Sequence, residues 1–301
     1  MLRPPFLKTA FAAFTSAPLV SVHIATLLFG LAGVLGAAVG LGAVEVTFGR
    51  TFFAAVALYL VCRSLNTSVS LQLKPGSTWL LLLSGVLLAF HWVTFFASIQ
   101  LSTVAIGLVT FSTCPVFVAL FEPLFFRKKW RIESLIAALM VLAGVLVISG
   151  VTSGEFTYIR GLLVGLLGGL SFAVLQLINR RLTNSSGALV TATIQNSVAA
   201  LVLLPLVFLS FKDFTLNQWV LLAVLGVACT AIAQTLFIHA LKQVSVSAAS
   251  LIAAGLEPVY GIIVAAVLLA QKPSVNELVG GLIILATVLF VTIRNNDSGT
   301  V

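Results

Sequence analysis

The sequence predicts an all-α polytopic membrane protein with ten transmembrane helices, arranged as an inverted repeat of two five-helix halves. Three observations carry this prediction. Hydrophobic residues make up 60% of the 301 positions and charged residues only 8%, whereas a soluble domain carries about a quarter charged residues. Long apolar runs recur along the whole chain, and the second half repeats a pattern of the first.

A chain of this composition cannot cover its surface with polar groups in water, so its solvent is expected to be lipid. Within a bilayer, only helix bundles and closed barrels satisfy the hydrogen bonds of the backbone. Barrel strands alternate polar and apolar residues, and the apolar runs of this chain do not alternate. The runs therefore predict helices.

Ten runs approach the roughly 20 apolar residues that a spanning helix needs. Their predicted bounds are 19–41, 44–62, 78–100, 103–126, 132–150, 160–182, 187–210, 216–241, 245–270 and 275–293. The first run is too long for the core of a signal peptide. The chain is expected to divide into an N-terminal segment (1–18), a first repeat (19–150), a second repeat (160–293) and a C-terminal tail (294–301).

The distribution of basic residues predicts the orientation in the membrane. Of the 16 basic residues, twelve fall on one side of the predicted bilayer, three fall on the other, and Arg50 lies within the second span. The positive-inside rule therefore places both termini in the cytoplasm, as an even number of spans requires. A multi-pass protein of the cell (inner) membrane is expected. The net charge of +8 is an orientation signal, and no nucleic-acid partner is predicted.

A shift of 143 residues aligns the two halves of the chain and brings Pro115 onto Pro258. The same register pairs residues of matching type, among them Ala97 with Ala240, Gln100 with Gln243, Ser102 with Ser245 and Lys129 with Lys272. Each half holds five spans, an odd number, so the second copy is expected to be inverted in the membrane. Inverted repeats are typical of secondary transporters, whose substrate site lies near the midplane between the repeats.

Three segments carry a resemblance to a known family. Residues 91–126, which begin His91-Trp92, resemble helices three and four of the ten-helix drug/metabolite transporter superfamily, and residues 245–272 resemble its helix nine. Arg50 resembles the arginine found early in helix two of that family. The aromatic third helix is similar to that of exporters of aromatic amino acids and paraquat-like cations. The chain departs from the family where many members carry Leu-Gly-Glu, since it has Phe-Arg-Lys at 126–128 and Ala-Gln-Lys at 270–272.

This resemblance implies a central cavity built by helices one, three, four, six, eight and nine. It also implies a secondary active exporter of small organic molecules that works by alternating access, with aromatic amino acids, related metabolites or organic cations as substrates. Two alternatives stay open: a nucleotide-sugar-type exchanger of the same fold, and a non-transporting membrane channel or scaffold. The expected partners are a small-molecule substrate and the lipid bilayer.

The sequence carries no sign of enzymatic chemistry. It has no catalytic triad, no zinc-ligand spacing, no paired carboxylates and no phosphate loop. The three cysteines, Cys62, Cys114 and Cys229, lie inside apolar runs and are expected to be packing residues. Neither a cofactor nor a metal site is predicted.

Glu257 is the leading candidate for a substrate-binding residue, because ionisable groups inside a membrane are expensive. It lies about 12 residues into the ninth span, roughly 18 Å deep. It is expected to neutralise a cationic group or to exchange a proton, which makes it a candidate for proton coupling. The alternative is a local capping role beside Pro258, whose missing N–H frees a carbonyl. Pro115 and Pro258 are expected to act as hinges.

Four residues of the third span are also candidates for the substrate site. His91 is predicted at mid-depth, with Phe95 and Ser98 on the same face of the helix at i+4 and i+7. This histidine either lines the cavity or packs with its hydrogen bonds satisfied. Trp92 lies beside it and either stacks on a substrate or faces lipid and neighbouring helices.

Polar residues of other spans complete the predicted site. Arg50 lies about six residues into the second span, within snorkelling distance of the outer face, and is a candidate partner for a substrate carboxylate. Gln176 and Gln234 are amides in the middle of spans, which either line the cavity or hydrogen-bond across helices.

Overall fold

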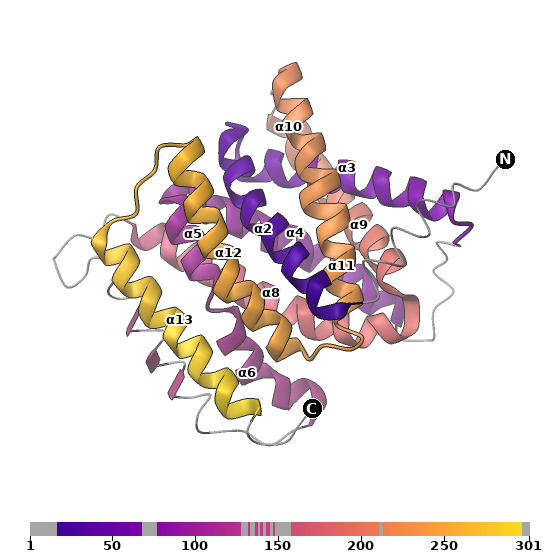
Figure 1. Ribbon diagram of the computed structural model, residues 1–301. Helices are drawn as coiled ribbons and strands as arrows, with labels where there is room; N and C mark the ends of the chain where they lie inside the picture. The colour runs from indigo at the N-terminus through magenta and orange to yellow at the C-terminus, as the bar shows by residue number, and fades with distance from the viewer. Residues whose placement is uncertain are drawn as a thin grey trace.

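The computed structural model describes residues 17–67, 77–127, 158–210 and 213–296, together with scattered positions between 132 and 147. Within these residues the regular structure is entirely helical (Figure 1). Eight helical segments are long and apolar enough to cross a membrane. The predicted span 132–150 lies mostly outside the described residues, so the count of ten helices stays a prediction.

The helices of the first half follow the predicted spans closely. Their bounds are Pro18–Ala38 for α2, Ala43–Ser64 for α3, Ser77–Leu101 for α4, Val104–Phe111 for α5 and Cys114–Phe126 for α6. The sequence predicts one span over 103–126, and the structure divides it into α5 and α6 at Ser112 and Thr113. Apolar content alone does not reveal this break.

The second half has the same order of helices. Their bounds are Ile159–Ser186 for α8, Ala188–Ser210 for α9, Leu216–Gly226 for α10, Val227–Ile232 for the π-helix η2, Ala233–Ala240 for α11, Val246–Leu268 for α12 and Val275–Asn296 for α13. The segments α10, η2 and α11 run on without a gap and together occupy the eighth predicted span. A π-helix has wider turns than an α-helix, and such segments are frequent at functional sites.

The helices pair in a pattern that stays the same when the two halves are exchanged. The helix α4 packs against α8, and its counterpart, the run from α10 to α11, packs against α2. In the same way α2 packs against α12, and its counterpart α8 packs against α5 and α6. Figure 1 shows α2 between α12 and α11. Finally, α3 packs against its own counterpart α9. The packing therefore repeats as the offset in the sequence predicts.

The two helix prolines of the repeat occupy different surroundings. Pro115 lies in the first turn of α6, directly after the break, whereas Pro258 lies inside the continuous helix α12. At the break, the Ser112 hydroxyl lies 3.0 Å from the Leu108 carbonyl and 2.8 Å from the Ala254 carbonyl of α12. The first of the two predicted hinges is therefore a discontinuity, and the second is a proline within an unbroken helix.

Two glycines allow α2 and α12 to approach each other closely. A Cβ atom on Gly30 would lie 2.9 Å from the carbonyl oxygen of Glu257, and one on Gly261 would lie 3.3 Å from the carbonyl oxygen of Gly30. Small residues at such positions are a common means of packing helices in membranes. This contact sets the position of Glu257 against the first half.

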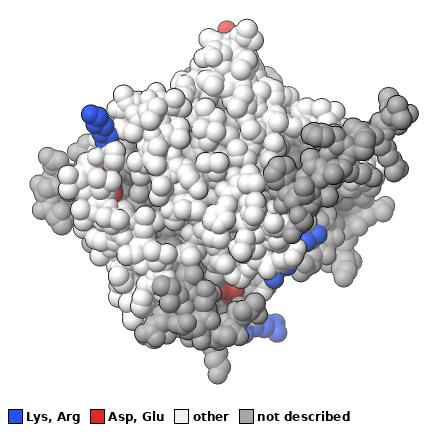
Figure 2. Space-filling model, viewed as in Figure 1, with Lys and Arg blue, Asp and Glu red and all other residues white. Residues whose placement is uncertain are grey.

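The surface is apolar, as expected for a protein surrounded by lipid. Leu209, Leu216 and Val267 are each more than 70% exposed, and such contiguous apolar surface is unusual on a soluble monomer. Figure 2 shows a face that is almost free of charge, with the few Lys, Arg, Asp and Glu residues toward its edges.

Candidate functional site

Arg50 of α3 lies in the interior between the two halves. Its side chain is completely buried and does not snorkel to the outer face, although its depth in the second span would allow this. The reason is that it has interior partners: its Nε donates to the Thr230 hydroxyl at 2.9 Å, and its Nη2 donates to the Cys229 carbonyl at 3.2 Å. Both partners belong to η2. The second terminal nitrogen, Nη1, has no hydrogen-bond partner.

An aromatic surface lies directly against the Arg50 guanidinium. The guanidinium carbon is 3.4 Å from the centroid of the Trp92 ring and 5.4 Å from that of Phe96. The two rings stack on each other at 5.9 Å, and both are buried. The face of an indole attracts a cation, and this attraction is strongest where water is excluded. Trp92 therefore packs inside the bundle and not against lipid, and its predicted role in stacking on a substrate stays a prediction.

His91 of α4 has one satisfied and one unsatisfied ring nitrogen. Its Nδ1 lies 3.0 Å from the Gly168 carbonyl of α8. A carbonyl only accepts, so Nδ1 carries the proton. The ring stacks on Phe172 at 4.7 Å and lies 5.6 Å from Phe111. Nε2 is buried without a partner, as is the indole nitrogen of Trp92.

Glu257 brings the opposite charge to the same interior from the second half of the chain. It is 1% exposed, and its Oε2 has no hydrogen-bond partner. It lies on α12, where Pro258 follows it directly. A buried charge without full compensation is costly. The predicted role of Glu257 in binding a cationic group or a proton stays a prediction.

The two predicted amides bond across helices. Gln234 of α11 accepts from the Asn196 amide at 2.7 Å and donates to Gln195 at 2.9 Å. Gln176 of α8 donates to the Cys114 sulfur at 3.3 Å and accepts from Ser250 at 2.9 Å. Of the two predicted roles, the bond across helices is the one observed.

Two further predicted residues lie in the packed interior of α4. Phe95 is 1% exposed and packs edge-on against Trp92 at 5.6 Å. Ser98 donates to the Gly161 carbonyl of α8 at 2.7 Å. The helix α4 therefore presents a row of aromatic rings and fastens itself to α8 through His91 and Ser98.

Sequence reasoning missed the contacts of three residues in this interior. Thr230 and Cys229 bind Arg50, and Asn196 has a buried amide oxygen without a partner. The 143-residue offset of the repeat pairs His91 with Gln234, which marks Gln234 as the counterpart of His91 in the second half. A threonine in an apolar span carries no such signal.

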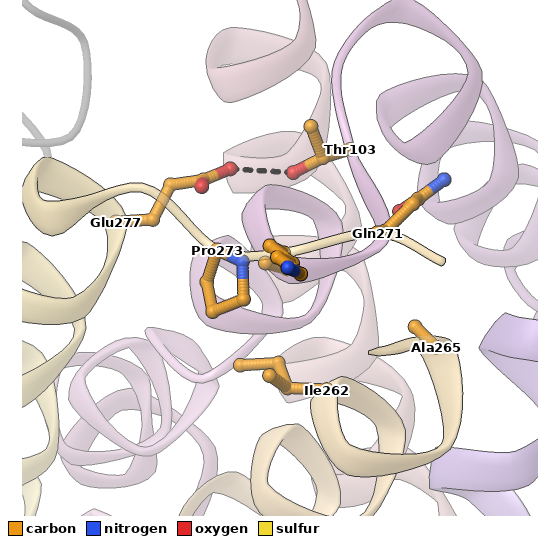
Figure 3. Close-up of a pocket in the computed structure, with 8 residues that line it drawn as sticks. Thr103, Ile262, Ala265, Gln271, Pro273 and Glu277 are labelled. Carbon is orange, nitrogen blue, oxygen red and sulfur yellow. Dashed lines mark hydrogen bonds between the residues drawn. The ribbon is translucent and has the colours of Figure 1, made fainter. Parts of the chain in front are cut away.

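A second polar cluster closes the end of the molecule where α5 begins. The Thr103 hydroxyl donates to Glu277 at 2.6 Å, and the Val104 amide donates to the Gln271 side chain at 3.2 Å. The other carboxylate oxygen of Glu277 accepts from the Ser274 amide at 2.5 Å. We call these five residues the Glu277 clamp. It borders a cavity of about 110 Å³ that Ile262 and Ala265 also line (Figure 3).

Metal chemistry finds no support in the described part of the chain. The residues described there contain no group of three or more His, Cys, Asp or Glu side chains placed to hold a metal ion. The three cysteines are buried free thiols.

Comparison with known proteins identifies the family. The model of the EamA-like transporter family matches the chain twice, at residues 16–150 and 159–293. The two matches start 143 residues apart, which is the offset read from the sequence. The repeat of two halves is therefore confirmed.

The chain is similar over most of its length to curated transporters. It is 24% identical to the uncharacterized transporter YxxF of Bacillus subtilis, covering 95% of this chain and 93% of that protein. It is 30% identical to an uncharacterized transporter of Archaeoglobus fulgidus, covering 81% and 86%. A crystal structure with 21% identity has the same fold, with a TM-score of 0.67 over 95% of this chain and 99% of the other. The chain is a multi-pass membrane protein, and it belongs to the EamA-like transporter family.

Proposed function

We propose that this transporter is a secondary active exporter of small zwitterionic or cationic organic molecules, with aromatic amino acids as the leading substrates. One observation carries the proposal: among the described residues, five buried polar side-chain atoms without hydrogen-bond partners lie in the core of the bundle. They are Arg50 Nη1, His91 Nε2, Trp92 Nε1, Asn196 Oδ1 and Glu257 Oε2. Leaving such an atom unsatisfied costs about 1–3 kcal/mol, and a substrate with donors and acceptors would satisfy them.

The charges of the site favour a zwitterion. Arg50 suits a carboxylate, because guanidinium groups bind carboxylates through paired hydrogen bonds. Glu257 suits an ammonium group, and the rings of Trp92, Phe95 and Phe96 suit an aromatic side chain. An organic cation would use Glu257 and the aromatic surface alone. Both substrate classes therefore fit the proposal, and the zwitterion uses more of the site.

Transport is proposed to follow alternating access, in which the halves open to one side of the membrane at a time. The break between α5 and α6 and the proline in α12 give each half a place to bend. Glu257 is the proposed group for proton coupling, because its carboxylate has an oxygen available to a proton or to an ammonium group. Both termini are proposed to face the cytoplasm of the cell.

Reconstitution into liposomes tests the function directly. A panel of radiolabelled aromatic amino acids, the corresponding amines, quaternary ammonium ions and nucleotide-sugars is offered to purified protein. Substrate-dependent counterflow is expected for aromatic amino acids, since only a carrier exchanges a labelled substrate for an unlabelled one. Uptake without counterflow would indicate a channel, and no movement of any substrate would favour a scaffold.

The nucleotide-sugar alternative is less well supported. A nucleotide-sugar carries two phosphate charges, which normally call for several cationic side chains. Among the described residues, Arg50 is the one buried Lys or Arg. Counterflow of a nucleotide-sugar in the same panel would reverse this preference.

A further inference from the structure

The π-helix η2 is the feature of the site that the proposed function leaves unexplained. Its residues Val227–Ile232 interrupt the α-helical run of the eighth span directly opposite Arg50. The equivalent positions of the first half, 84–89, lie in the uninterrupted helix α4. The wide turn is therefore no general property of the repeat and belongs to the half that faces the arginine.

The wide turn fixes the direction of one hydroxyl group. Thr230 donates its single hydroxyl proton to the Leu225 carbonyl, five residues earlier, at 2.8 Å. A hydroxyl has one proton and two lone pairs, so only lone pairs remain toward Arg50, whose Nε donates to them at 2.9 Å. In an α-helix the usual reach of a threonine hydroxyl is the carbonyl three or four residues earlier. Thr230 therefore accepts from Arg50, as any hydroxyl facing a guanidinium must, and the wide turn directs its proton to the Leu225 carbonyl.

Close approach of the two helices makes this contact possible. A Cβ atom on Gly226, just before η2, would lie 2.6 Å from the Arg50 carbonyl oxygen and 2.6 Å from the Phe53 side chain. Any larger residue would push the eighth span away from α3. The glycine and the wide turn together place Thr230 and the Cys229 carbonyl within reach of the guanidinium.

These contacts occupy one edge of the guanidinium group and leave its other edge without hydrogen-bond partners. Nε and Nη2, which share an edge, bind Thr230 and Cys229, while one face lies on Trp92. The remaining edge is formed by Nη1, which has no partner, and the second proton of Nη2. Two parallel N–H groups on one edge match the two oxygens of a carboxylate.

We propose that Thr230 and the π-turn around it are positioning elements that hold Arg50 flat on Trp92, so that its Nη1–Nη2 edge binds the carboxylate of a substrate. This proposal rests on the proposed function for the identity of the substrate. The prediction for selectivity is that Thr230 governs recognition of the carboxylate and has little influence on the amine end.

Emission from Trp92 tests the positioning without any substrate. In a background with Trp79, Trp130 and Trp219 changed to phenylalanine, emission comes from Trp92 alone. Arg50→Lys removes the guanidinium from the ring and sets the scale of the change. Thr230→Val should shift the emission toward that of Arg50→Lys, and Thr230→Ser should leave it unchanged. Thr235→Val is the matched control, because the Thr235 hydroxyl is equally buried but donates to the Ala231 carbonyl.

Transport tests the selectivity in the unmodified background. Thr230→Val should raise KM for an aromatic amino acid about tenfold, the loss of one hydrogen bond to a charged group. The same variant should change KM for the amine that lacks the carboxylate by less than about twofold, and Thr230→Ser should restore the amino acid. Equal changes for both substrates, or none, would overturn the proposal.

The two measurements separate the two proposals. If Thr230→Val leaves Trp92 emission unchanged, or Thr235→Val shifts it as much, the positioning role is wrong even if export is observed. If the wild-type protein exports no substrate while the emission responds as expected, the proposed function fails and the positioning of Arg50 stands.

Discussion

The guanidinium of Arg50 rests on the indole of Trp92, 3.4 Å from the ring centroid, in the interior between the two halves. A desolvated contact of this kind contributes about 2 kcal/mol or more, and it is strongest for tryptophan. We therefore expect Trp92→Ala to lower kcat/KM for export at least tenfold, and Trp92→Phe to lower it only a few fold. Counterflow in liposomes measures both. Trp219→Ala, on the partly exposed surface of α10, is the control and should transport normally.

Glu257 should be required for substrates that carry an ammonium group. Glu257→Gln keeps the shape of the side chain but removes the charge, so export should fall and its dependence on pH should flatten. Uptake measured between pH 5 and 9 checks this. Glu122→Gln, in the last two turns of α6 where the carboxylate accepts from Ser247, is the matched control and should keep the wild-type profile. Normal rates for Glu257→Gln at every pH would assign the carboxylate a structural role.

The packing of α2 against α12 predicts a position-specific effect of adding one methyl group. Gly30→Ala should lower the thermal stability in detergent, by about 1–3 kcal/mol of overpacking, because its Cβ would lie 2.9 Å from the Glu257 carbonyl. Gly255→Ala on the same pair of helices has open space around it and should be neutral or slightly stabilising. Equal melting temperatures for the two variants would contradict the packing described above.

The Glu277 clamp should control access to the cavity beneath it. Thr103 and Val104 belong to the first half, and Gln271 and Glu277 to the second, so their hydrogen bonds hold the halves together at this end. In a protein without its native cysteines, Ala265→Cys should react slowly with a soluble maleimide. Adding Glu277→Ala should speed the reaction roughly tenfold, the loss of a charge-assisted hydrogen bond. The exposed carboxylate Asp213, changed to alanine, is the control and should leave the rate unchanged.

The orientation proposed from the basic residues is tested by labelling. Ser153, in the predicted loop after the fifth span, lies outside the described residues. Ser153→Cys in a cysteine-free background should react with an impermeant reagent added to intact cells. Ser64→Cys, at the end of α3, should react only after the membrane is opened. The reverse pattern would place the termini outside.

The helices could be predicted from the sequence because lipid imposes a simple rule on length and polarity. The bounds of α2, α3, α8 and α9 lie within a few residues of the predicted runs. The sequence did not predict the break between α5 and α6 or the π-turn at Thr230, because neither feature alters the apolar content of its span. Local backbone geometry depends on side-chain hydrogen bonds to other helices, which hydropathy does not record.

The candidate site was predictable residue by residue, but its arrangement was not. The rarity of charge within spans marked Glu257 and Arg50. Their surroundings depend on residues far away in the chain, since Thr230 lies 180 positions from Arg50. For this reason the burial of Arg50 could not be predicted: its depth alone allowed snorkelling, and only the fold supplies interior partners.

The two halves share a fold, yet each charged group of the site occurs once. The position equivalent to Arg50 is Thr193, and the position equivalent to Glu257 is Cys114. A duplicated scaffold with identical side chains would offer the same surroundings to either end of a guest molecule. With the cation in one half and the carboxylate in the other, the interior is polar along the line that joins the halves. Under the proposed function, a dipolar substrate is therefore expected to bind in one direction, with its carboxylate toward the first half and its ammonium group toward the second.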